Sequence, residues 1–224
     1  MAKGLFIAID GTDGSGKTVQ STRLVERLRD MGKQVEILSF PRYGNPSASF
    51  IEKYLQGHYG SAEQVGPKRA SLLYAVDRYD DADRIQAMLD QGTILVTNRY
   101  VSANKGHQMG KIKDPVEQRA FLDWLNELEY GIFQIPKPDL TLLLHVPAEI
   151  GKRLAEARDG EASKKDIHQA DLQHLKDAEA AYLRLPEIDT VERWERIACV
   201  EQDRLLSIDQ IHERIWSKVG PLLS

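Results

Sequence analysis

Short apolar runs alternate with longer stretches of mixed polarity along the chain. The runs lie at residues 5–9, 35–40, 93–97, 140–146 and 196–200. Between them, apolar residues recur at spacings of three and four, which is typical of amphipathic helices. Strands that alternate with helices predict an α/β fold, in which a parallel sheet carries helices on both faces. The run at 140–146 is almost uniformly apolar, as in a strand that is covered on both sides.

The predicted helices differ in length and in how clearly they begin and end. They cover about residues 19–31, 47–57, 67–91, 115–130, 148–158, 169–185 and 208–219. Pro67 is well placed to open the longest helix, and Gly92 to end it. Residues 101–114 are predicted to form a polar loop, and the charged residues 159–166 a mobile one. We expect one domain over residues 1–224, with a short lid at about 153–168.

A glycine-rich motif follows the first apolar run and precedes the first predicted helix. Its residues are Gly11, Thr12, Asp13, Gly14, Ser15, Gly16, Lys17 and Thr18, which match G-x-x-x-x-G-K-[ST]. Glycines let the main chain curl so that several N–H groups face one hollow, and the helix N-terminus adds a positive dipole end. Lys17 can reach the outer phosphates of a nucleotide, and Thr18 can bind Mg²⁺. The motif predicts binding of a nucleoside triphosphate.

Composition narrows the choice of partners and compartment. The formal net charge of −4 over 224 residues argues against general binding to nucleic acid or to a membrane surface. A single cysteine, Cys199, excludes an internal disulfide and fits a reducing cytosol. The first predicted strand begins close to Met1, and no apolar run approaches the length of a membrane span. We therefore expect a cytoplasmic protein with no signal peptide.

Arginine and aromatic side chains gather where ligands of parallel sheets bind, at the carboxyl ends of the strands. Tyr74 and Arg78 are four residues apart and share one helical face, which suits a nucleobase. Arg78 could instead pair with Asp77, Asp81 or a neighbouring loop, and Tyr74 could belong to the core. The full set of candidates for a second substrate is Phe40, Arg42, Tyr43, Tyr74, Arg78, Arg99, Asn104 and Gln108.

Several segments together give a specific resemblance. They are residues 9–18, 40–44, 73–78, 98–104 and 136–140, with the sequences IDGTDGSGKT, FPRYG, LYAVDR, NRYVSAN and PKPDL. Spread in this order over most of the chain, they resemble the thymidylate kinase family, P-loop enzymes that phosphorylate dTMP with ATP. The resemblance implies a three-layer P-loop NTPase fold with a five-stranded parallel sheet of order 2-3-1-4-5. It also implies Mg²⁺ and a homodimer.

The resemblance assigns the dTMP site residue by residue. Asp13 would hold the sugar 3′-hydroxyl, and Tyr74 would stack on thymine. Arg99 would grip the 5′-phosphate, with help from Arg42 and Tyr43. The other expected contacts, which border the pocket, read the thymine edge or face the sugar, are Phe40, Arg78, Asn104, His107 and Gln108.

Catalytic positive charge is expected from the lid, because the glycine motif has no arginine between Asp13 and Gly16. The resemblance makes Lys17, Arg99, Arg158 and Lys165 the catalytic cations and Arg153 a further contact to the ATP phosphates.

Three positions depart from the usual pattern of the family. Asn98 stands where the family usually has Asp, and Asp10 stands where it usually has Glu. The residues expected to bind Mg²⁺ are Thr18, Asp10 and Asn98. His107 stands where Tyr or Phe would crowd a 2′-hydroxyl, so discrimination against ribonucleotides stays open.

Other readings of the motif remain. A related P-loop kinase could act on a deoxynucleoside or on a different nucleoside monophosphate. A nucleotide-binding switch of low activity is a second alternative, and Asn98 makes an inactive kinase a third. A GTPase-type switch would carry an Asn-Lys-x-Asp motif after a strand, and the sequence has none: residues 136–139 read Pro-Lys-Pro-Asp and precede a strand.

Overall fold

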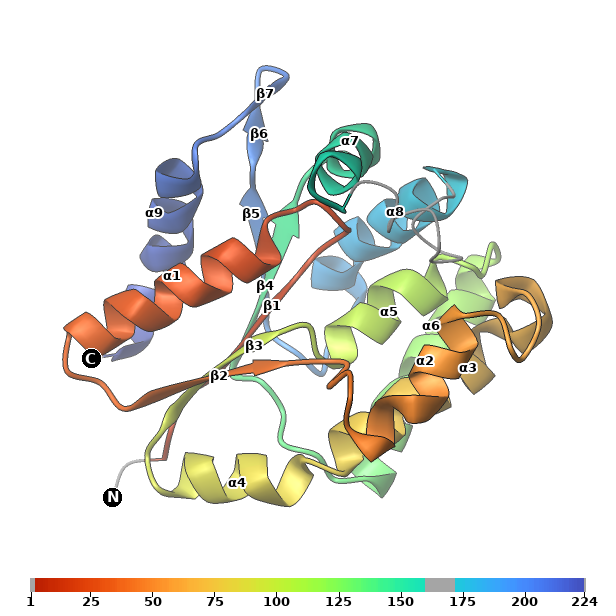
Figure 1. Ribbon diagram of the computed structural model, residues 1–224, viewed down its shortest axis with the longest axis horizontal. Coiled ribbons are helices and arrows are strands. Elements are labelled where there is room, and N and C mark those ends of the chain that lie inside the picture. The colour runs from red at the N-terminus through yellow and green to blue at the C-terminus, as the bar shows by residue number, and fades with distance from the viewer. Residues whose placement is uncertain (1–2, 160–171, 224) are drawn as a thin grey trace.

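Five parallel strands form the central sheet of the computed structural model, which describes residues 3–159 and 172–223 (Figure 1). The strands are β1 (Phe6–Asp10), β2 (Val35–Ser39), β3 (Ile94–Asn98), β4 (Leu140–His145) and β5 (Trp194–Ala198). Their spatial order is β2-β3-β1-β4-β5, which confirms the expected topology.

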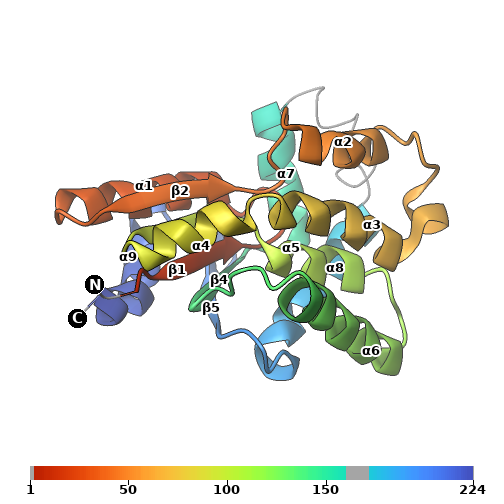
Figure 2. The same ribbon diagram turned by 90° about the horizontal axis from the view of Figure 1, so that it is seen from below.

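Helices cover both faces of the sheet (Figures 1 and 2). On one face, apolar side chains of α1 (Lys17–Asp30) and α9 (Ile208–Val219) pack on Ile7 and Ile9 of β1. On the other face, Phe6 and Ala8 share a core with a second group of helices. These are α3 (Ala62–Tyr79), α4 (Ala82–Asp90), α5 (Val101–Met109), α6 (Pro115–Asn126) and α8 (Leu172–Ile188). Alternate residues of β1 thus serve opposite cores, as in a strand buried on both sides.

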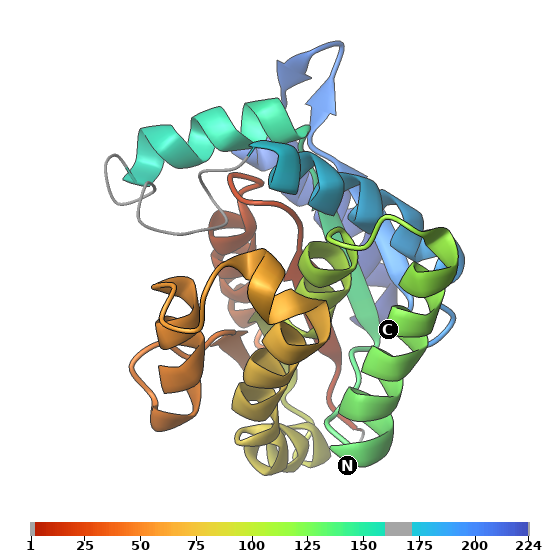
Figure 3. The same ribbon diagram turned by 90° about the vertical axis from the view of Figure 1, so that its right-hand side faces the viewer.

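Smaller elements lie around this frame. They are a 3₁₀ turn (Pro46–Ala48), α2 (Ser49–Leu55), a π-helix (Glu127–Ile132), α7 (Ala148–Asp159), the hairpin strands β6 (Val200–Glu201) and β7 (Arg204–Leu205), and a 3₁₀ turn (Gly220–Leu223). Figure 3 looks onto the carboxyl edge of the sheet, with α7 above the glycine loop and α2 and α3 to one side. Within the described ranges, no helix has both the length and the apolar character that crossing a membrane requires.

Strand register places the candidate chemistry. Ile9 of β1 lies opposite Asn98 of β3, and Asp10 lies opposite Leu143 of β4. Because β1 and β3 are parallel neighbours, the segments that leave them begin side by side at one edge. The glycine loop after β1 and Arg99 after β3 are therefore adjacent.

The predicted long helix over residues 67–91 is wrong. The structure has two helices there, and α3 starts earlier, at Ala62. Gly66 interrupts α3 with a φ of 74°, so Pro67 opens a new helical segment after the kink. The chain turns again at Asp80 and Asp81, between α3 and α4, where both carboxylates bind Arg42.

The predicted loop over residues 101–114 is also wrong, because it contains α5. The helix buries polar side chains, among them Ser102, Asn104, Lys105 and Gln108. Each of these side chains makes a hydrogen bond inside the protein, so it can be buried at little cost. The sequence of α5 therefore lacks the regular spacing of apolar residues by which a buried helix is usually predicted.

A buried ion cluster holds α5 against the segment between α8 and β5. Lys105 Nζ donates to Asp189 Oδ2 at 2.6 Å and to Glu192 Oε1 at 2.5 Å, and all three side chains are at most 1% exposed. Glu192 also accepts hydrogen bonds from Tyr130 and Thr141, each at 2.7 Å. A buried charge of this kind persists only when its partners satisfy it, as they do here.

The side chain of Tyr182 on α8 packs directly against α5 at Gly106. A Cβ on Gly106 would lie 2.2 Å from a ring carbon of Tyr182. Since Tyr182 is only 1% exposed, its ring has little room to move away.

We expect the substitution Gly106→Ala to lower the free energy of unfolding by about 1–3 kcal/mol, because overlap with Tyr182 outweighs the helix propensity of alanine. Gly220→Ala is the matched control, since its Cβ would meet Trp216 no closer than 3.4 Å at a helical φ of −49°. Urea denaturation measures both variants. Equal midpoints for Gly106→Ala and the unsubstituted protein would contradict the packing argument.

Candidate functional site

Three glycines let the loop between β1 and α1 curl at the carboxyl edge of the sheet. Gly11, Gly14 and Gly16 have φ values of 146°, 78° and 84°, which residues with a Cβ rarely adopt. Lys17 Nζ donates hydrogen bonds to the carbonyl oxygens of Gly11 at 2.9 Å and Thr12 at 2.8 Å. The ammonium thus lies across the curled main chain, a position suited to the phosphates of a nucleotide.

The helix α7 packs directly on this loop. A Cβ on Gly14 would lie 2.0 Å from the carbonyl oxygen of Gly151, and one on Gly151 would lie 2.6 Å from that of Asp13. Paired glycines therefore allow the first turn of α7, just before the predicted lid, to touch the loop.

The structure describes the predicted lid in part. Arg153 is exposed on α7. The side chain of Arg158 and the whole of Lys165 lie outside the described residues, as does the stretch 160–168.

Arg99 faces the glycine loop from the end of β3. Its backbone φ is 65°, and Nη2 donates to Oδ1 of Asp13 within the loop. Lys17 Nζ lies 3.9 Å from the same carboxylate oxygen. Burial lowers the pKa of Arg99, but the charges of Asp13 and Asp10 outweigh burial and raise it overall. Two cations and one carboxylate therefore meet where the two strands end.

Asp10 lies beneath this meeting point and is fully buried. It accepts hydrogen bonds from Ser102 Oγ at 2.5 Å, from the Tyr182 hydroxyl at 2.9 Å and from the backbone N–H of Gly11 at 2.8 Å. Burial raises the pKa of Asp10, although the charge of Lys17 opposes that shift. The carboxylate joins the loop, α5 and α8, and it lines neither of the cavities described below.

Asn98 and Thr18 lie next to each other at the loop. Asn98 Nδ2 donates to Thr18 Oγ1 at 3.2 Å. Asn98 Oδ1 is buried, and no residue in the described part of the chain hydrogen-bonds to it. The same part contains no group of three His, Cys, Asp or Glu side chains that could hold a metal ion. The Thr18 hydroxyl and Asn98 Oδ1 are the oxygens that a cation would meet at this point of the loop.

A cavity that we call the aromatic cavity opens beside Arg99. Its lining is Asp13, Phe40, Pro41, Tyr43, Leu55, Tyr74, Arg78, Arg99, Tyr100, Ala103, Asn104, His107 and Gln108. Every residue predicted for the second substrate is in this lining except Arg42. The prediction drew them from four separate segments, and folding brings them together.

Aromatic rings shape the walls of the aromatic cavity. Tyr74 meets the buried ring of Tyr54 edge-on, with centroids 6.4 Å apart. His107 stacks on His174 at 5.8 Å and meets Tyr182 edge-on at 5.6 Å. Burial, and then the charge of Arg99, lower the pKa of His107 well below its usual range. The imidazole is therefore neutral near pH 7.

Arg78 reaches the aromatic cavity while fixed by a buried ion pair. Its Nε donates to Glu129 Oε2 at 3.0 Å, and the two side chains are 2% and 0% exposed. Neither Asp77 nor Asp81, the partners considered from the sequence, takes this role. Burial lowers the pKa of Arg78, but the charge of Glu129 raises it overall. Glu129 lies on the π-helix, which no sequence signal indicated.

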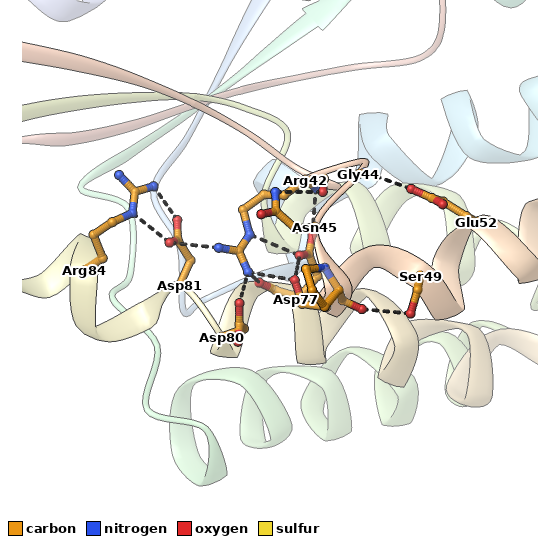
Figure 4. Close-up of polar contacts among 11 residues, drawn as sticks. Arg42, Gly44, Asn45, Ser49, Glu52, Asp77, Asp80, Asp81 and Arg84 are labelled. Atoms are coloured by element: carbon orange, nitrogen blue, oxygen red, sulfur yellow. Dashed lines mark hydrogen bonds and ion pairs between the residues drawn. The ribbon is translucent and has the colours of Figure 1, made fainter.

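Arg42 is absent from the lining of the aromatic cavity and holds its own loop by polar contacts (Figure 4). Its guanidinium donates to Asp77 at 3.1 Å and to Ser47 at 2.9 Å, and it also binds Asp80 and Asp81. The backbone N–H of Arg42 donates to Asp77 Oδ2 at 2.8 Å. The structure thus does not bring Arg42 together with the other predicted contacts.

A second cavity, which we call the loop cavity, extends along the glycine loop. Its lining includes residues 13–20, Ser39, Asn98 and Leu154, and it ends on Leu205, Leu206, Ile208 and Ile211. Among these, Leu205 and Ile208 expose 45% and 50% of their surface. Leu205 comes from the β6–β7 hairpin and Ile208 from the start of α9. The sequence predicted the helix but not the hairpin, whose turn, Gln202-Asp203, contains no glycine, and neither residue was a candidate for the site.

The two cavities share one wall. The residues that line both are Asp13, Phe40, Pro41, Tyr43 and Arg99. A ligand in the loop cavity and a ligand in the aromatic cavity would therefore meet at Asp13 and Arg99.

Comparison with known proteins gives consistent results for the fold and for the family. A solved structure of thymidylate kinase from Candida albicans has the same fold, with a TM-score of 0.74 at 23% identity, over 99% of this chain and 93% of that one. Thymidylate kinase of Thermomicrobium roseum is 30% identical over 220 residues, which cover 97% of this chain and 95% of the relative. The human thymidylate kinase is 28% identical, over 98% of this chain and 97% of its own. The thymidylate kinase family model matches residues 9–215, and the chain therefore belongs to the thymidylate kinase family.

Proposed function

We propose that this chain transfers the γ-phosphate of ATP to dTMP, giving ADP and dTDP, with ATP in the loop cavity and dTMP in the aromatic cavity. The observation that carries the proposal is the shared wall at Asp13 and Arg99. Phosphoryl transfer requires two bound anions in line and close together, and this wall lies between the two cavities.

ATP, the phosphate donor, binds along the glycine loop between β1 and α1. The curled main chain and Lys17 bind the outer phosphates, and the positive end of α1 adds to them. The apolar surface formed by Val19, Leu205 and Ile208 supports the purine. Arg153, Arg158 and Lys165 remain the proposed lid cations.

The acceptor side rests on α3, α5 and the segment after β3. Tyr74 stacks on thymine, while Arg78, Asn104 and Gln108 bond its edge. Arg99 binds the 5′-phosphate. Asp13 takes the 3′-hydroxyl, Phe40, Tyr43 and His107 close the walls, and Arg42 holds the loop that carries Tyr43.

The reaction needs no general base. The second pKa of a phosphate monoester is about 6, so the attacking oxygen of dTMP is already anionic at neutral pH. What the residues supply is alignment and charge neutralisation by Lys17, Arg99 and the lid cations.

The residues near Thr18 fit a nucleotide-bound Mg²⁺. Thr18 offers a hydroxyl, and Asn98 Oδ1 is a buried oxygen without a partner in the described part of the chain. Such a cation neutralises phosphate charge when bound. Asp10, committed to three donors, supports the loop from behind.

We also propose a homodimer in the cytoplasm. Leu72, Val76 and Tyr79 expose 39%, 44% and 55% of their surface along one side of α3, which supports contact with a second copy. The free, buried Cys199 agrees with a reducing compartment.

A substrate panel tests the proposed function. ADP formation from Mg·ATP is measured with dTMP, dUMP, dCMP, AMP and thymidine as acceptors. We expect the largest kcat/KM with dTMP. Higher activity on AMP or thymidine, or ATP hydrolysis that ignores every acceptor, would contradict it.

We expect Lys17→Ala to lower kcat by at least about a thousandfold, because the transferring phosphoryl group loses its nearest cation. Lys33→Ala, an exposed lysine after α1, is the matched control and keeps normal turnover. A near-normal rate for Lys17→Ala would refute the assigned role.

Substitution of Arg99 separates the two substrates. We expect Arg99→Ala to lower kcat/KM for dTMP by about a hundredfold or more, since charge-assisted bonds to phosphate are lost, while the KM for ATP changes less than about threefold. Arg119→Ala, half exposed on α6, serves as control. Comparable losses for both substrates would count against a 5′-phosphate contact.

The neutral side chain at Asn98 has a measurable consequence. We expect Asn98→Asp to reduce the Mg²⁺ concentration for half-maximal rate by about fivefold, because a carboxylate is a stronger ligand for this cation than an amide. Asn45→Asp makes the same charge change on an exposed loop and should leave the Mg²⁺ titration unaltered. An unchanged titration for Asn98→Asp would show that this side chain is not near the metal.

A further inference from the structure

Lys111, just beyond α5, is a partly buried lysine with unusual partners. Its Nζ donates to Gln108 Oε1 at 2.7 Å and to the hydroxyl of Tyr54 at 3.1 Å. No carboxylate in residues 3–159 or 172–223 forms an ion pair with it. Burial lowers the pKa of Lys111 to about 8, so the position of this ammonium has an electrostatic cost. The two neutral partners of Lys111 therefore indicate what this buried ammonium group does.

The contact fixes which way the Gln108 carboxamide faces. An ammonium group can only donate, so the carbonyl Oε1 must be the atom that faces Lys111. The amino group, Nε2, then lies on the opposite side of the carboxamide. Gln108 lines the aromatic cavity, and it accordingly presents N–H donors to a ligand there.

Asn104, one helical turn earlier, is fixed in the opposite sense. Its Nδ2 donates to the backbone carbonyl of Ser71 at 3.2 Å, and a carbonyl can only accept. The atom of Asn104 left for the cavity is therefore the acceptor Oδ1. Together, α5 presents one donor and one acceptor, and neither amide can turn without losing its partner.

We propose that Lys111 is a positioning residue for base selection: by holding Gln108 as a donor, it makes the aromatic cavity select bases with an imide edge. Thymine and uracil offer a carbonyl oxygen to Gln108 and a ring N–H to Asn104. Cytosine has an amino group in place of one carbonyl and an unprotonated ring nitrogen in place of the N–H. This inference rests on the proposed function, in which Arg99 holds the 5′-phosphate and so fixes the position of the base.

The second partner of Lys111 extends its influence to the other wall. Tyr54 is fully buried on α2, and its ring supports Tyr74, which lines the cavity. The ammonium also lies 5.8 Å from the centroid of the Tyr54 ring. Lys111 thus links the edge-reading side chain on α5 to the ring pair of α2 and α3.

The test compares base preference in the full-length enzyme. The kcat/KM values for dTMP and dCMP are measured for the unsubstituted protein, Lys111→Met, Lys111→Arg and Lys113→Met. We expect Lys111→Met to lower the ratio of dTMP to dCMP by about tenfold, because Gln108 becomes free to turn its carbonyl to the base. Lys111→Arg, which still only donates, keeps most of the preference, and Lys113→Met, 70% exposed, keeps all of it.

A double substitution shows whether Lys111 acts through Gln108. In the Gln108→Leu background, adding Lys111→Met should leave the dTMP to dCMP ratio within about twofold, since no carboxamide remains to be oriented. An unchanged ratio in Lys111→Met alone, or an equal loss in the Gln108→Leu background, would overturn the proposal. Thermal unfolding is followed in parallel, because a structural role alone would lower the melting temperature without changing the ratio. Failure of the proposed function would instead be visible in the unsubstituted protein, as absent dTMP-dependent turnover.

Discussion

The buried carboxylate of Asp10 is the contact on which the geometry of the site depends. Isolated in an apolar interior, an ionised carboxylate would be strongly unfavourable, but here donors from the glycine loop, α5 and α8 satisfy it. The charges of Lys17 and Arg99 favour its ionised form. Because one side chain fixes the loop to the helix that carries the acceptor contacts, the loop cavity and the aromatic cavity cannot shift independently. Alignment between two substrates is thereby built into the core of the domain.

Buried hydrogen bonds also fix the position of helix α5. Three of its buried polar residues have partners on three other parts of the chain: Ser102 binds β1, Lys105 binds the segment before β5, and Asn104 binds α3. Close packing at Gly106 adds α8. Hydrogen bonds are directional, so a helix held in this way has one rotation and one height that satisfy all its partners. Apolar packing alone would allow α5 to slide or rotate slightly against its neighbours. Such a movement would displace the side chains of α5 that line the aromatic cavity.

These polar anchors also explain what the sequence could and could not reveal. The strands and the glycine loop were predictable, because apolar runs and a phosphate-binding motif are local signals. Most residues of the aromatic cavity were named from their place near strand ends and from the family resemblance, whereas Pro41, Leu55, Tyr100 and Ala103 of its lining were not. Helix α5 was missed because its interior positions are polar, and their partners, such as Asp189, lie far along the chain. Arg42 and Arg99 both follow strands, and what distinguishes them is that Asp77 of α3 and Asp80 and Asp81 just after it bind Arg42. The β6–β7 hairpin has no glycine in its turn, Gln202-Asp203, so the usual sequence signal of a tight hairpin is missing.

The ion pair between Arg99 and Asp13 suggests how the site would change when the acceptor binds. A guanidinium in a partly buried site needs an anion, and the carboxylate supplies one while the cavities hold no ligand. A phosphate dianion carries more charge than a carboxylate and offers more acceptor atoms, so it competes well for the same donors. In the proposed complex Arg99 would bind the 5′-phosphate, and Asp13 would then be available to a sugar hydroxyl in the same cavity. Binding of the acceptor would thus replace one ion pair by two substrate contacts, with Lys17 still 3.9 Å from the Asp13 carboxylate.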